Sequence, residues 1–530
     1  YQAADIGTAT PLSNSATILS YPGEVGRNEV PGLTGTVAMS RLAHRANAGR
    51  IVEIPVAVGF CMYVRRECLD AVGLFRADLF AQGYGEENDF CLRARHLGWR
   101  HVAAAAVYVG HCGGQSFGAA GPALQARNQA ILNRLHPGYD RLVAEWAAAE
   151  PMAEPFRRFD LARWRAARPR GSVAAILITH ADGGGVERRV VESCRAHRAA
   201  GRRPIVLRPD PDGAGVAVGE ESAEAYPHLR YRLPPEMGAL LRLLRGEAPE
   251  LIELHHVLGH SPAVYELIAE LALPYDVHVH DWVWICPRII LLGADRRYCG
   301  EPDAATCDAC VADAGRALDE AIPTAALRER SAHLLSGARR VVAPSKDAAL
   351  RLRRHFPDVS PVVVPHEDDS VLPPLRARRR AGGRVRICVV GAIGVAKGYD
   401  VLLACARDAA RRDLPLEFVV VGHSIDDHRL IETGRVFVTG EFAAGEAVAL
   451  IQAQDADLAL LPSIWPETWC YALTDAWRAG LRVAAFDIGA PAERIRRTER
   501  GFLMPLGLSA SRINDAMLAA CLYSVHVCAS

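Results

Sequence analysis

The sequence predicts an α/β protein built from doubly wound parallel sheets, and three observations support this. Short apolar runs, such as residues 173–179, 386–390 and 483–486, are typical of buried strands. Segments with helical spacing separate these runs, which favours βαβ units. Glycines or polar residues directly follow several runs, as expected at the carboxyl ends of parallel strands, where open α/β sheets bind ligands.

Length and composition narrow the class of protein. A chain of 530 residues suggests roughly three domains. Its formal net charge of +0 argues against binding to nucleic acid or to an acidic membrane surface. The 14 cysteines follow no repeated framework and there is no transmembrane run, so we expect a cytoplasmic protein. The chain opens inside an apparent domain, which leaves open an upstream signal or anchor.

An acidic cluster marks the first predicted unit, residues 1–145. Glu86, Glu87 and Asp89 follow Gly85 and lead into a helix, and His111 follows a later strand. Carboxylates and imidazole suit Mn²⁺ or Mg²⁺, and a carboxylate can deprotonate a hydroxyl nucleophile. The alternative is a set of acids favoured by the helix dipole and a histidine in a turn. We also expect strands at 51–58, 59–64 and 102–109.

Four segments of this unit together carry a resemblance. They are residues 8–17 (TATPLSNSAT), 59–61 (GFC), 85–89 (GEEND) and His111, and they resemble the later half of a family 2 glycosyltransferase of GT-A fold. The resemblance implies Glu87 as catalytic base, with Glu86 and Asp89 beside it and His111 as a ligand of Mn or Mg. The family's Asp-x-Asp motif precedes the matching part and is absent from this chain, so a partial GT-A unit is expected.

A glycine-rich loop and a cysteine cluster distinguish the second unit, residues 172–367, which follows a helical linker at 146–171. Gly183, Gly184 and Gly185 lie between a strand and a helix, where backbone N–H groups can approach an oxygen-rich ligand. The cluster suggests a structural Zn²⁺ site, with buried free thiols as the alternative. Its members are Cys286, Cys299, Cys307 and Cys310, and His278 or His280 could replace one of them.

One of two lysines in the chain marks the third unit, residues 385–515. Lys397 lies in the loop 391–398 (GAIGVAKG) between a strand and a helix, and the only other lysine is Lys346. Where arginine is the usual base, a lysine indicates a need for a compact point charge. We expect Lys397 and the helix N-terminus to neutralise a diphosphate, with chance survival of a solvated lysine as the alternative.

An acidic pair follows a later strand of the same unit. In residues 461–477 (LPSIWPETWCYALTDAW), Glu467 lies between a strand and a helix, and Asp475 lies about two helical turns further on. Both can face one cleft at the carboxyl edge of a parallel sheet. The alternative is an acid favoured by the helix dipole and a solvated aspartate.

Residues 172 to about 515 resemble family 4 glycosyltransferases of GT-B fold, on this acidic stretch, the 391–398 loop and residues 487–493 (DIGAPAE). The resemblance implies a pair of Rossmann-like domains in which the first acid contacts the donor sugar, the second the ribose, and the lysine the diphosphate. The donor-binding candidates are Gly183, Gly184, Gly185, Gly391, Lys397, Gly398, Gly422, Glu467, Thr468 and Asp475. Two departures are the shorter acid Asp475 and Ala392, where the family often has arginine.

The sequence therefore predicts a glycosyltransferase that joins a partial GT-A unit to a GT-B unit, with a tail at 516–530. The candidate catalytic residues are Glu467, Glu87 and His280. The resemblance implies a nucleotide-sugar donor, a glycan or lipid-linked glycan acceptor and a role in bacterial surface polysaccharide, with peripheral membrane association left open. The GT-B unit needs no metal, whereas the GT-A unit would. The alternatives are a GT-B-fold nucleotide-sugar epimerase and a non-catalytic glycan-binding role for the GT-A unit.

Overall fold

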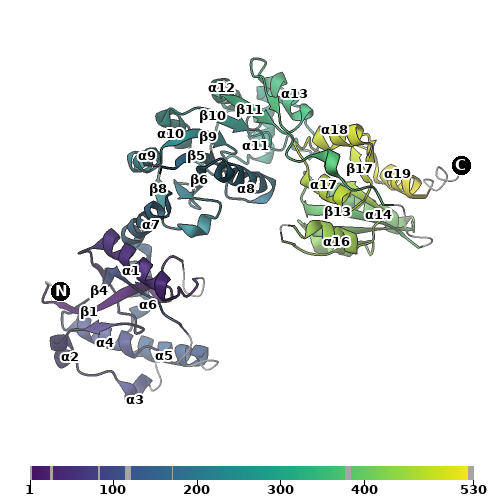
Figure 1. The fold of residues 1–530 in the computed structure, drawn as a ribbon. Coiled ribbons are helices and arrows are strands. Elements are labelled where there is room, and N and C mark those ends of the chain that lie inside the picture. The colour runs from purple at the N-terminus through teal and green to yellow at the C-terminus, as the bar shows by residue number, and fades with distance from the viewer. Residues whose placement is uncertain are drawn as a thin grey trace. The chain divides into compact units, whose positions relative to one another are not determined.

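The computed structural model describes residues 3–23, 28–80, 84–113, 121–169, 171–376, 383–443 and 445–522 (Figure 1). Of the predicted tail, residues 523–530 lie outside the described residues. In the structure the chain divides into two compact units, and from here on the first unit and the second unit are these two rather than the three predicted from the sequence. The first comprises Tyr1–Val173, Gly201–Asp210 and Gly215–Leu243, and the second comprises Ala174–Ala200, Pro211–Ala214 and Leu244–Ser530.

A four-stranded sheet of order β2-β4-β1-β3 forms the centre of the first unit. Its strands are β1 (Ile6–Ser13), β2 (Val52–Ile54), β3 (Tyr63–Val64) and β4 (Arg100–Val109). The long pair β1 and β4 is parallel, whereas β2 and β3 pair antiparallel at the edges. The predicted strand 59–64 is wrong for its first four residues, because the chain bends at 59–61 and only Tyr63–Val64 pairs with β1.

The helices of the first unit cover this sheet. They are α1 (Leu33–Asn47), α2 (Arg66–Val72), α3 (Ala77–Phe80), α4 (Glu86–His96), α5 (Gly121–Leu135), α6 (Tyr139–Ala148) and α7 (Ala153–Ala167), with a 3₁₀ turn η1 (Thr17–Leu19). The segment predicted as a helical linker supplies α7, whose Phe159 and Trp164 are fully buried. Phe159 stacks on Tyr21 with 4.1 Å between ring centroids, so this helix contributes to the core of the first unit.

An antiparallel meander also belongs to the first unit. Its strands are β6 (Arg202–Pro209), β7 (Gly215–Gly219) and β8 (Arg230–Arg232), with a 3₁₀ turn η3 (Ala223–Ala225), and α9 (Met237–Gly246) follows. β7 pairs antiparallel with both of its neighbours.

The second unit contains five parallel strands in the order β12-β11-β10-β9-β5. They are β5 (Val173–Ile178), β9 (Pro249–Leu254), β10 (Tyr275–His278), β11 (Arg340–Ala343) and β12 (Val362–Val363). Their helices are α8 (Gly184–Ala199), α10 (Ala263–Leu271), α11 (Ala304–Ala314), α12 (Thr324–Gly337) and α13 (Lys346–His355), followed by η4 (Asp369–Val371). The strand–helix alternation confirms the α/β prediction for this region.

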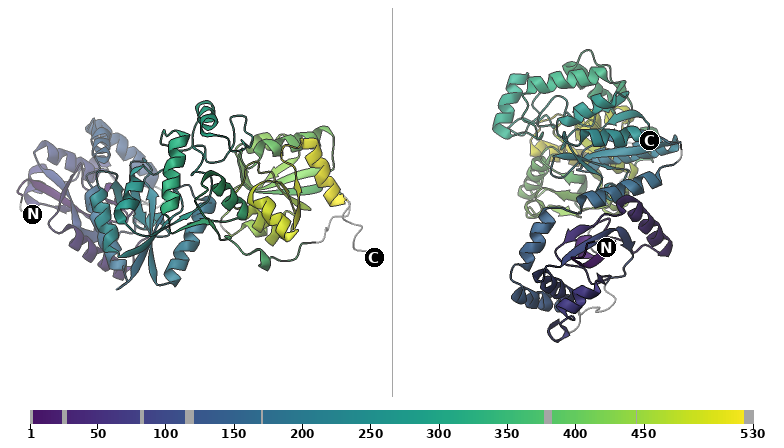
Figure 2. Two further views of the ribbon diagram at one scale, coloured as in Figure 1. Left: turned by 90° about the horizontal axis from the view of Figure 1, so that it is seen from above. Right: turned by 90° about the vertical axis from the view of Figure 1, so that its left-hand side faces the viewer.

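A six-stranded parallel sheet of order β15-β14-β13-β16-β17-β18 completes the second unit. The strands are β13 (Val385–Ile393), β14 (Leu416–Ser424), β15 (Val436–Val438), β16 (Leu458–Leu461), β17 (Val483–Phe486) and β18 (Gly501–Met504). The helices are α14 (Tyr399–Arg411), α15 (Asp427–Ile431), α16 (Ala447–Ala453), α17 (Tyr471–Arg478), α18 (Gly489–Thr498) and α19 (Ala510–Leu522), shown in green to yellow in Figures 1 and 2.

Helices cover both faces of this sheet, because alternate side chains of its strands point to opposite sides. Ile387 and Val389 of β13 pack with α14 and α19, whereas Cys388 and Val390 pack with α16 and α17. The central strands β13, β14, β16 and β17 are therefore largely buried on both faces, which explains their continuous apolar sequences.

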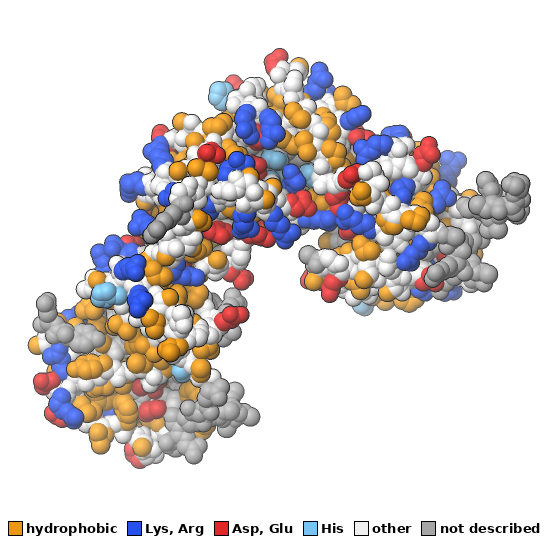
Figure 3. Space-filling model, viewed as in Figure 1, with side chains coloured by type: hydrophobic (Ala, Val, Ile, Leu, Met, Phe, Trp, Pro, Cys, Tyr) orange, Lys and Arg blue, Asp and Glu red, His pale blue; other side chains and the backbone are white. Residues whose placement is uncertain are grey.

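The described surface mixes charges of both signs. Figure 3 shows basic and acidic side chains interspersed on the face in view, in agreement with the formal net charge of +0. Among the described residues, no helix is both long and apolar enough to cross a membrane.

Candidate functional site

The loop from β13 to α14 places Lys397 beside the end of β16. Gly398 has φ +83°, and a Cβ there would lie 1.9 Å from the carbonyl oxygen of Pro462. Only glycine fits this close backbone approach. The contact is reinforced by Ile464, whose backbone N–H donates to the carbonyl oxygen of Ala396 at 3.0 Å. The loop is thereby held against the acidic stretch that follows β16.

Glu467 lies within this acidic stretch, is buried and faces Lys397. Its side chain accepts a hydrogen bond from the Ser463 hydroxyl, with 2.6 Å between Oγ and Oε1. The other carboxylate oxygen, Oε2, lies 4.0 Å from Nζ of Lys397. The negative charge of Glu467 raises the pKa of Lys397, so the ammonium stays charged at neutral pH. The Lys397 side chain is 42% exposed, which leaves the cation accessible to a ligand.

The backbone of Glu467 is fixed by the start of α18. Gly489 has φ +68°, and a Cβ there would lie 2.8 Å from the backbone nitrogen of Glu467. The N–H of Ala490 donates to the Glu467 carbonyl oxygen at 2.8 Å. The predicted 487–493 motif therefore positions the acid through backbone contacts.

Asp475, the second predicted acid, has different surroundings from Glu467. It lies on α17, and its Oδ1 is 3.8 Å from Nη1 of Arg478. Burial raises the pKa of Asp475, and the charge of Glu367 adds to this, while Arg188 and Arg478 act in the opposite direction. The carboxylate therefore lies in a mixed field of acids and arginines.

Glu367 joins the two halves of the second unit, and sequence reasoning missed it. Its Oε1 accepts from Nη2 of Arg188 at 2.8 Å and lies 3.1 Å from Nη1 of Arg478. Its Oε2 accepts from the Thr474 hydroxyl at 2.6 Å and from Nε1 of Trp469 at 3.3 Å. The available signal was an acid shortly after a short apolar strand, but its partners lie more than 100 residues away on either side.

The predicted glycine-rich loop reaches the same region. Gly183 and Gly184 adopt φ of +73° and +72° at the start of α8. A Cβ at Gly185 would lie 3.3 Å from the Tyr471 ring, and the Arg188 guanidinium lies 4.1 Å from the centroid of that ring. The structure thus brings the loop to the N-terminal end of α17.

Two hydrogen bonds connect the segment after β10 to the acidic stretch. Nε1 of Trp282 donates to the Pro466 carbonyl oxygen at 2.9 Å, and the Thr468 hydroxyl donates to the His280 carbonyl oxygen at 2.5 Å. The predicted candidates His280 and Thr468 are therefore neighbours. His280 is partly exposed at the surface, but desolvation of its imidazole lowers its pKa well below the usual range and keeps it neutral.

Gly391 and Gly422 lie opposite each other at the ends of β13 and β14. A Cβ at Gly422 would lie 2.3 Å from the Gly391 carbonyl oxygen. This crowding excludes any larger residue at position 422.

In the first unit, the predicted acids lie at the start of α4 but have unequal surroundings. Asp89 is fully buried and accepts hydrogen bonds from Arg76, from Nε of Arg93 at 2.9 Å and from Nε2 of His136 at 2.8 Å. Burial and the charge of Glu86 raise the pKa of Glu87. Oε2 of Glu86 is buried without a hydrogen-bond partner.

The predicted metal ligand His111 is held by its backbone and by one ring nitrogen. Its Nδ1 lies 2.7 Å from the Ser15 carbonyl oxygen, and its ring stacks with Phe60. Within the described part of the first unit, Glu86, Asp89 and His111 do not bring three ligand atoms within 4.8 Å of one another. The structure does not bring these three residues together as a ready-made cation site, and metal binding by the first unit stays a prediction.

The four predicted zinc cysteines lie in the segment between β10 and α12. Cys286 is buried, and Cys299, Cys307 and Cys310 are partly exposed. Cys307 Sγ lies 3.4 Å from Nη2 of Arg328. Among the described residues, these thiols do not form a group of three ligand atoms within 4.8 Å of one another, and zinc binding by them stays a prediction.

Comparison with known proteins identifies the domain that carries Lys397 and Glu467. Residues 384–521 match the family model described as "Glycosyl transferases group 1". This group 1 glycosyltransferase domain supports transferase activity for the chain. A search of curated proteins found no match.

Several solved structures are similar to about two thirds of this chain. Anabaena Alr3699/HepE in complex with UDP and glucose is 15% identical, with 65% of this chain and 90% of that chain covered and a TM-score of 0.40. Sucrose-phosphate synthase from Thermosynechococcus elongatus is 17% identical, with coverages of 66% and 90% and a TM-score of 0.44. A glycosyltransferase from Rickettsia africae ESF-5 is 14% identical, with coverages of 67% and 89% and a TM-score of 0.45.

Proposed function

We propose that the second unit is a GT-B glycosyltransferase that moves a sugar from a nucleotide-diphosphate donor to a glycan hydroxyl. The observation that carries this is the pair of Lys397 and Glu467, which are 4.0 Å apart within the domain that matches group 1 glycosyltransferases. An accessible cation next to a buried acid suits a donor that presents an anionic diphosphate beside neutral sugar hydroxyls.

In this proposal Lys397 stabilises the departing diphosphate. Its ammonium stays protonated because Glu467 raises its pKa, and it lies in the loop at the N-terminus of α14, where backbone N–H groups also favour anions. Glu467 accepts hydrogen bonds from the donor sugar through Oε2, while Ser463 holds the other oxygen. Catalysis is then largely positioning and leaving-group electrostatics, with retention at the anomeric carbon and no metal requirement.

The predicted ribose contact falls to Asp475, which is shorter by one methylene than the glutamate usual at that position. Ala392 supplies no cation near the loop, so Lys397 carries more of the phosphate neutralisation. For this reason we expect donor affinity, rather than reaction type, to differ from that of the family.

For the first unit, we propose a role in glycan binding or transfer. Glu87 is the candidate base, because its raised pKa brings it closer to the range of a general base. We further propose a glycan or lipid-linked glycan acceptor and a role in bacterial surface polysaccharide. The proposed location is cytoplasmic, at the inner face of the membrane.

A binding screen of the whole chain against nucleotide sugars tests the proposal for the second unit. We expect calorimetric binding of at least one nucleotide diphosphate sugar, followed by sugar transfer to a glycan acceptor. Turnover that survives chelation by EDTA would support the metal-independent mechanism. Interconversion of the donor without any acceptor would instead favour an epimerase, and the absence of binding across the panel would refute the assignment.

A further inference from the structure

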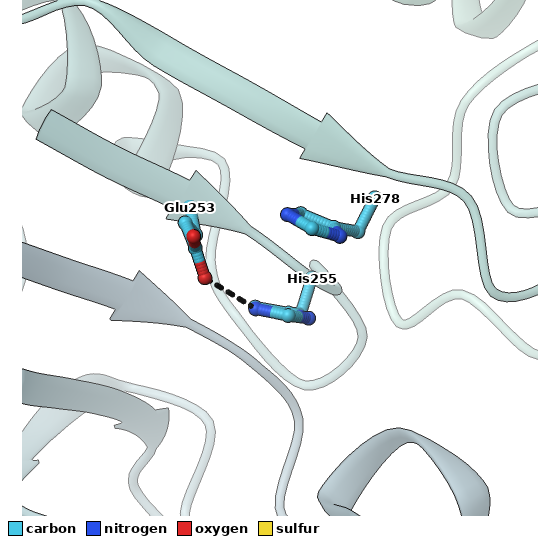
Figure 4. A group of neighbouring side chains, drawn as sticks. All are labelled: Glu253, His255 and His278. Carbon is cyan, nitrogen blue, oxygen red and sulfur yellow. Dashed lines mark hydrogen bonds and ion pairs between the residues drawn. The ribbon is translucent and has the colours of Figure 1, made fainter. Parts of the chain in front are cut away.

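A buried group of histidines and a glutamate lies at the carboxyl ends of β9 and β10 (Figure 4). The parallel register pairs Val277 with Leu254, so the next residues along each strand, His278 and His255, are neighbours. Glu253 precedes His255 by two residues and therefore shares its face of the sheet. None of these residues belongs to the match at 384–521 or to the Lys397 site.

The three side chains present ligand atoms to one another. One ligand atom each from Glu253, His255 and His278 lies within 4.8 Å of the other two. Nε2 of His255 is 3.3 Å from Oε2 of Glu253, and the rings of His255 and His278 stack with 4.4 Å between centroids. In Figure 4 both imidazoles lie on the same side of the strands as the carboxylate.

His278 is an unusual residue to bury in this way. Its side chain is buried, yet Nε2 has no hydrogen-bond partner. A buried polar group without a partner destabilises the folded state unless a ligand satisfies it. Burial also lowers the pKa of His278 well below its usual range, which keeps the imidazole neutral with a lone pair free to bind a cation.

Glu253, unlike the neutral His278, carries a charge. Burial alone would raise its pKa, but the hydrogen bond with His197 lowers it, so the carboxylate is ionised. Two neutral imidazoles and one carboxylate are a ligand set that zinc sites use in proteins.

We propose that Glu253, His255 and His278 bind a divalent transition-metal ion of the Zn²⁺ class. With metal–ligand bonds of about 2.0–2.1 Å at a tetrahedral ion, two ligand atoms lie roughly 3.3 Å apart. The Glu253–His255 separation of 3.3 Å already matches this spacing. The ring planes of His255 and His278 are inclined by only 14°, so His278 must tilt toward Glu253 for its nitrogen to complete the site.

The surroundings supply the supporting contacts that metal ligands need. Nδ1 of His255 lies 3.0 Å from Nε2 of His280, and Oε1 of Glu253 lies 3.1 Å from Nε2 of His197. Such partners fix the orientation of ligating imidazoles and carboxylates. Because the His280 carbonyl oxygen also accepts from Thr468, an ion here would rigidify the segment next to Glu467.

Zinc titration of the full chain tests the site. The chain, purified without a polyhistidine tag, carries Cys307→Ser and Cys310→Ser, which remove two of the four cysteines of the predicted thiolate site. We expect about one equivalent of Zn²⁺ by elemental analysis after dialysis. His278→Ala should weaken binding more than the 10–100-fold typical of losing a supporting partner. His428→Ala, at an exposed histidine of α15, is the matched control and should leave affinity unchanged.

Two further measurements keep the proposal testable if His278→Ala fails to fold. Glu253→Gln retains the shape of the side chain and should also reduce zinc affinity. Co²⁺ bound to the cysteine double variant should show the absorption of nitrogen and oxygen ligands without thiolate charge-transfer bands. Absence of zinc from the cysteine double variant, or binding that neither His278→Ala nor Glu253→Gln changes, would overturn the site.

Discussion

Two buried carboxylates, Asp89 in the first unit and Glu467 in the second, differ in how far their charge is satisfied. Asp89 accepts from two arginines and a histidine. Glu467 accepts one hydrogen bond from Ser463 and faces Lys397 at 4.0 Å, beyond hydrogen-bond distance. A carboxylate enclosed by guanidinium groups has no capacity left for a ligand, whereas Glu467 retains an oxygen for one. The comparison indicates a structural role for the first acid and a binding role for the second.

Replacing Asp89 should have the largest effect, and only on stability. Removing one partner of a buried ion pair leaves an uncompensated charge and costs about 3–5 kcal/mol. We expect Asp89→Ala to accelerate hydrogen exchange in α4 by the factor to which this loss of unfolding free energy corresponds. Peptides from α14 in the same sample are the internal control, and donor binding should be unchanged. Weakened donor binding with normal exchange in α4 would reverse the comparison.

The hydrogen bonds to Asp89 also make the stability of the first unit depend on pH in the acid range. Hydrogen bonds from the basic partners outweigh burial and lower the pKa of Asp89 from 3.8 to about 2. Because the folded-state pKa is below the unfolded one, this stabilisation is present above about pH 4 and is lost as pH falls toward 2. Exchange in α4 should therefore increase across that window, and Asp89→Ala should remove this component of the pH dependence.

Replacing Glu467 should affect turnover rather than stability. Glu467→Gln keeps the size of the side chain and the Ser463 contact but removes the charge. By analogy with the loss of one preorganised catalytic contact, we expect about a 10²–10³-fold decrease in kcat. Steady-state transfer kinetics measure this, with thermal unfolding as the folding control. Unchanged kcat would place Glu467 with Asp89 as a structural acid.

Removing the cation that faces Glu467 should weaken donor binding. Lys397→Ala should cost about 2 kcal/mol, roughly 30-fold in Kd, because a charge-assisted contact to the diphosphate is lost. Lys346→Ala is the matched control at the other lysine of the chain. Calorimetry with the best nucleotide sugar from the screen provides the measurement, and equal affinities for both variants would refute the phosphate assignment.

The smallest effect is expected at the second acid of the motif. Asp475→Glu restores the usual length of that side chain and should tighten donor binding by less than about 10-fold. The reference is Asp475→Asn, which should weaken binding modestly. If Asp475→Glu weakens binding instead, the Arg188 and Glu367 surroundings, rather than a ribose, determine the preferred length.

Much of the second unit follows from local sequence. The apolar runs that predicted β5, β13 and β17 are buried strands, and the α/β prediction is confirmed. Gly398 and Gly489 adopt positive φ where α14 and α18 begin, which a strand–loop–helix pattern suggests. These features depend on residues near one another in the chain, so periodicity and turn chemistry suffice to find them.

The features that were missed depend on contacts between distant segments. Glu367 acquires partners on α8 and α17, and no local pattern indicates which acid will do so. The strand predicted at 59–64 shortens to two residues because pairing with β1 overrides its apolar composition. By contrast, polar residues alternate with apolar ones in residues 253–255 and 276–280, and this pattern is visible in the sequence. Two adjacent parallel strands would place those polar residues together.

The two lysines offer a chemical footprint of the donor site. Lys346 is exposed, whereas the Lys397 side chain is 42% exposed and has its pKa raised by Glu467. Amine acylation requires the unprotonated form, so Lys397 should react more slowly than Lys346 and should be shielded further by a bound diphosphate. In a chain of 530 residues, one pair of modified peptides thus serves as both probe and reference for ligand occupancy.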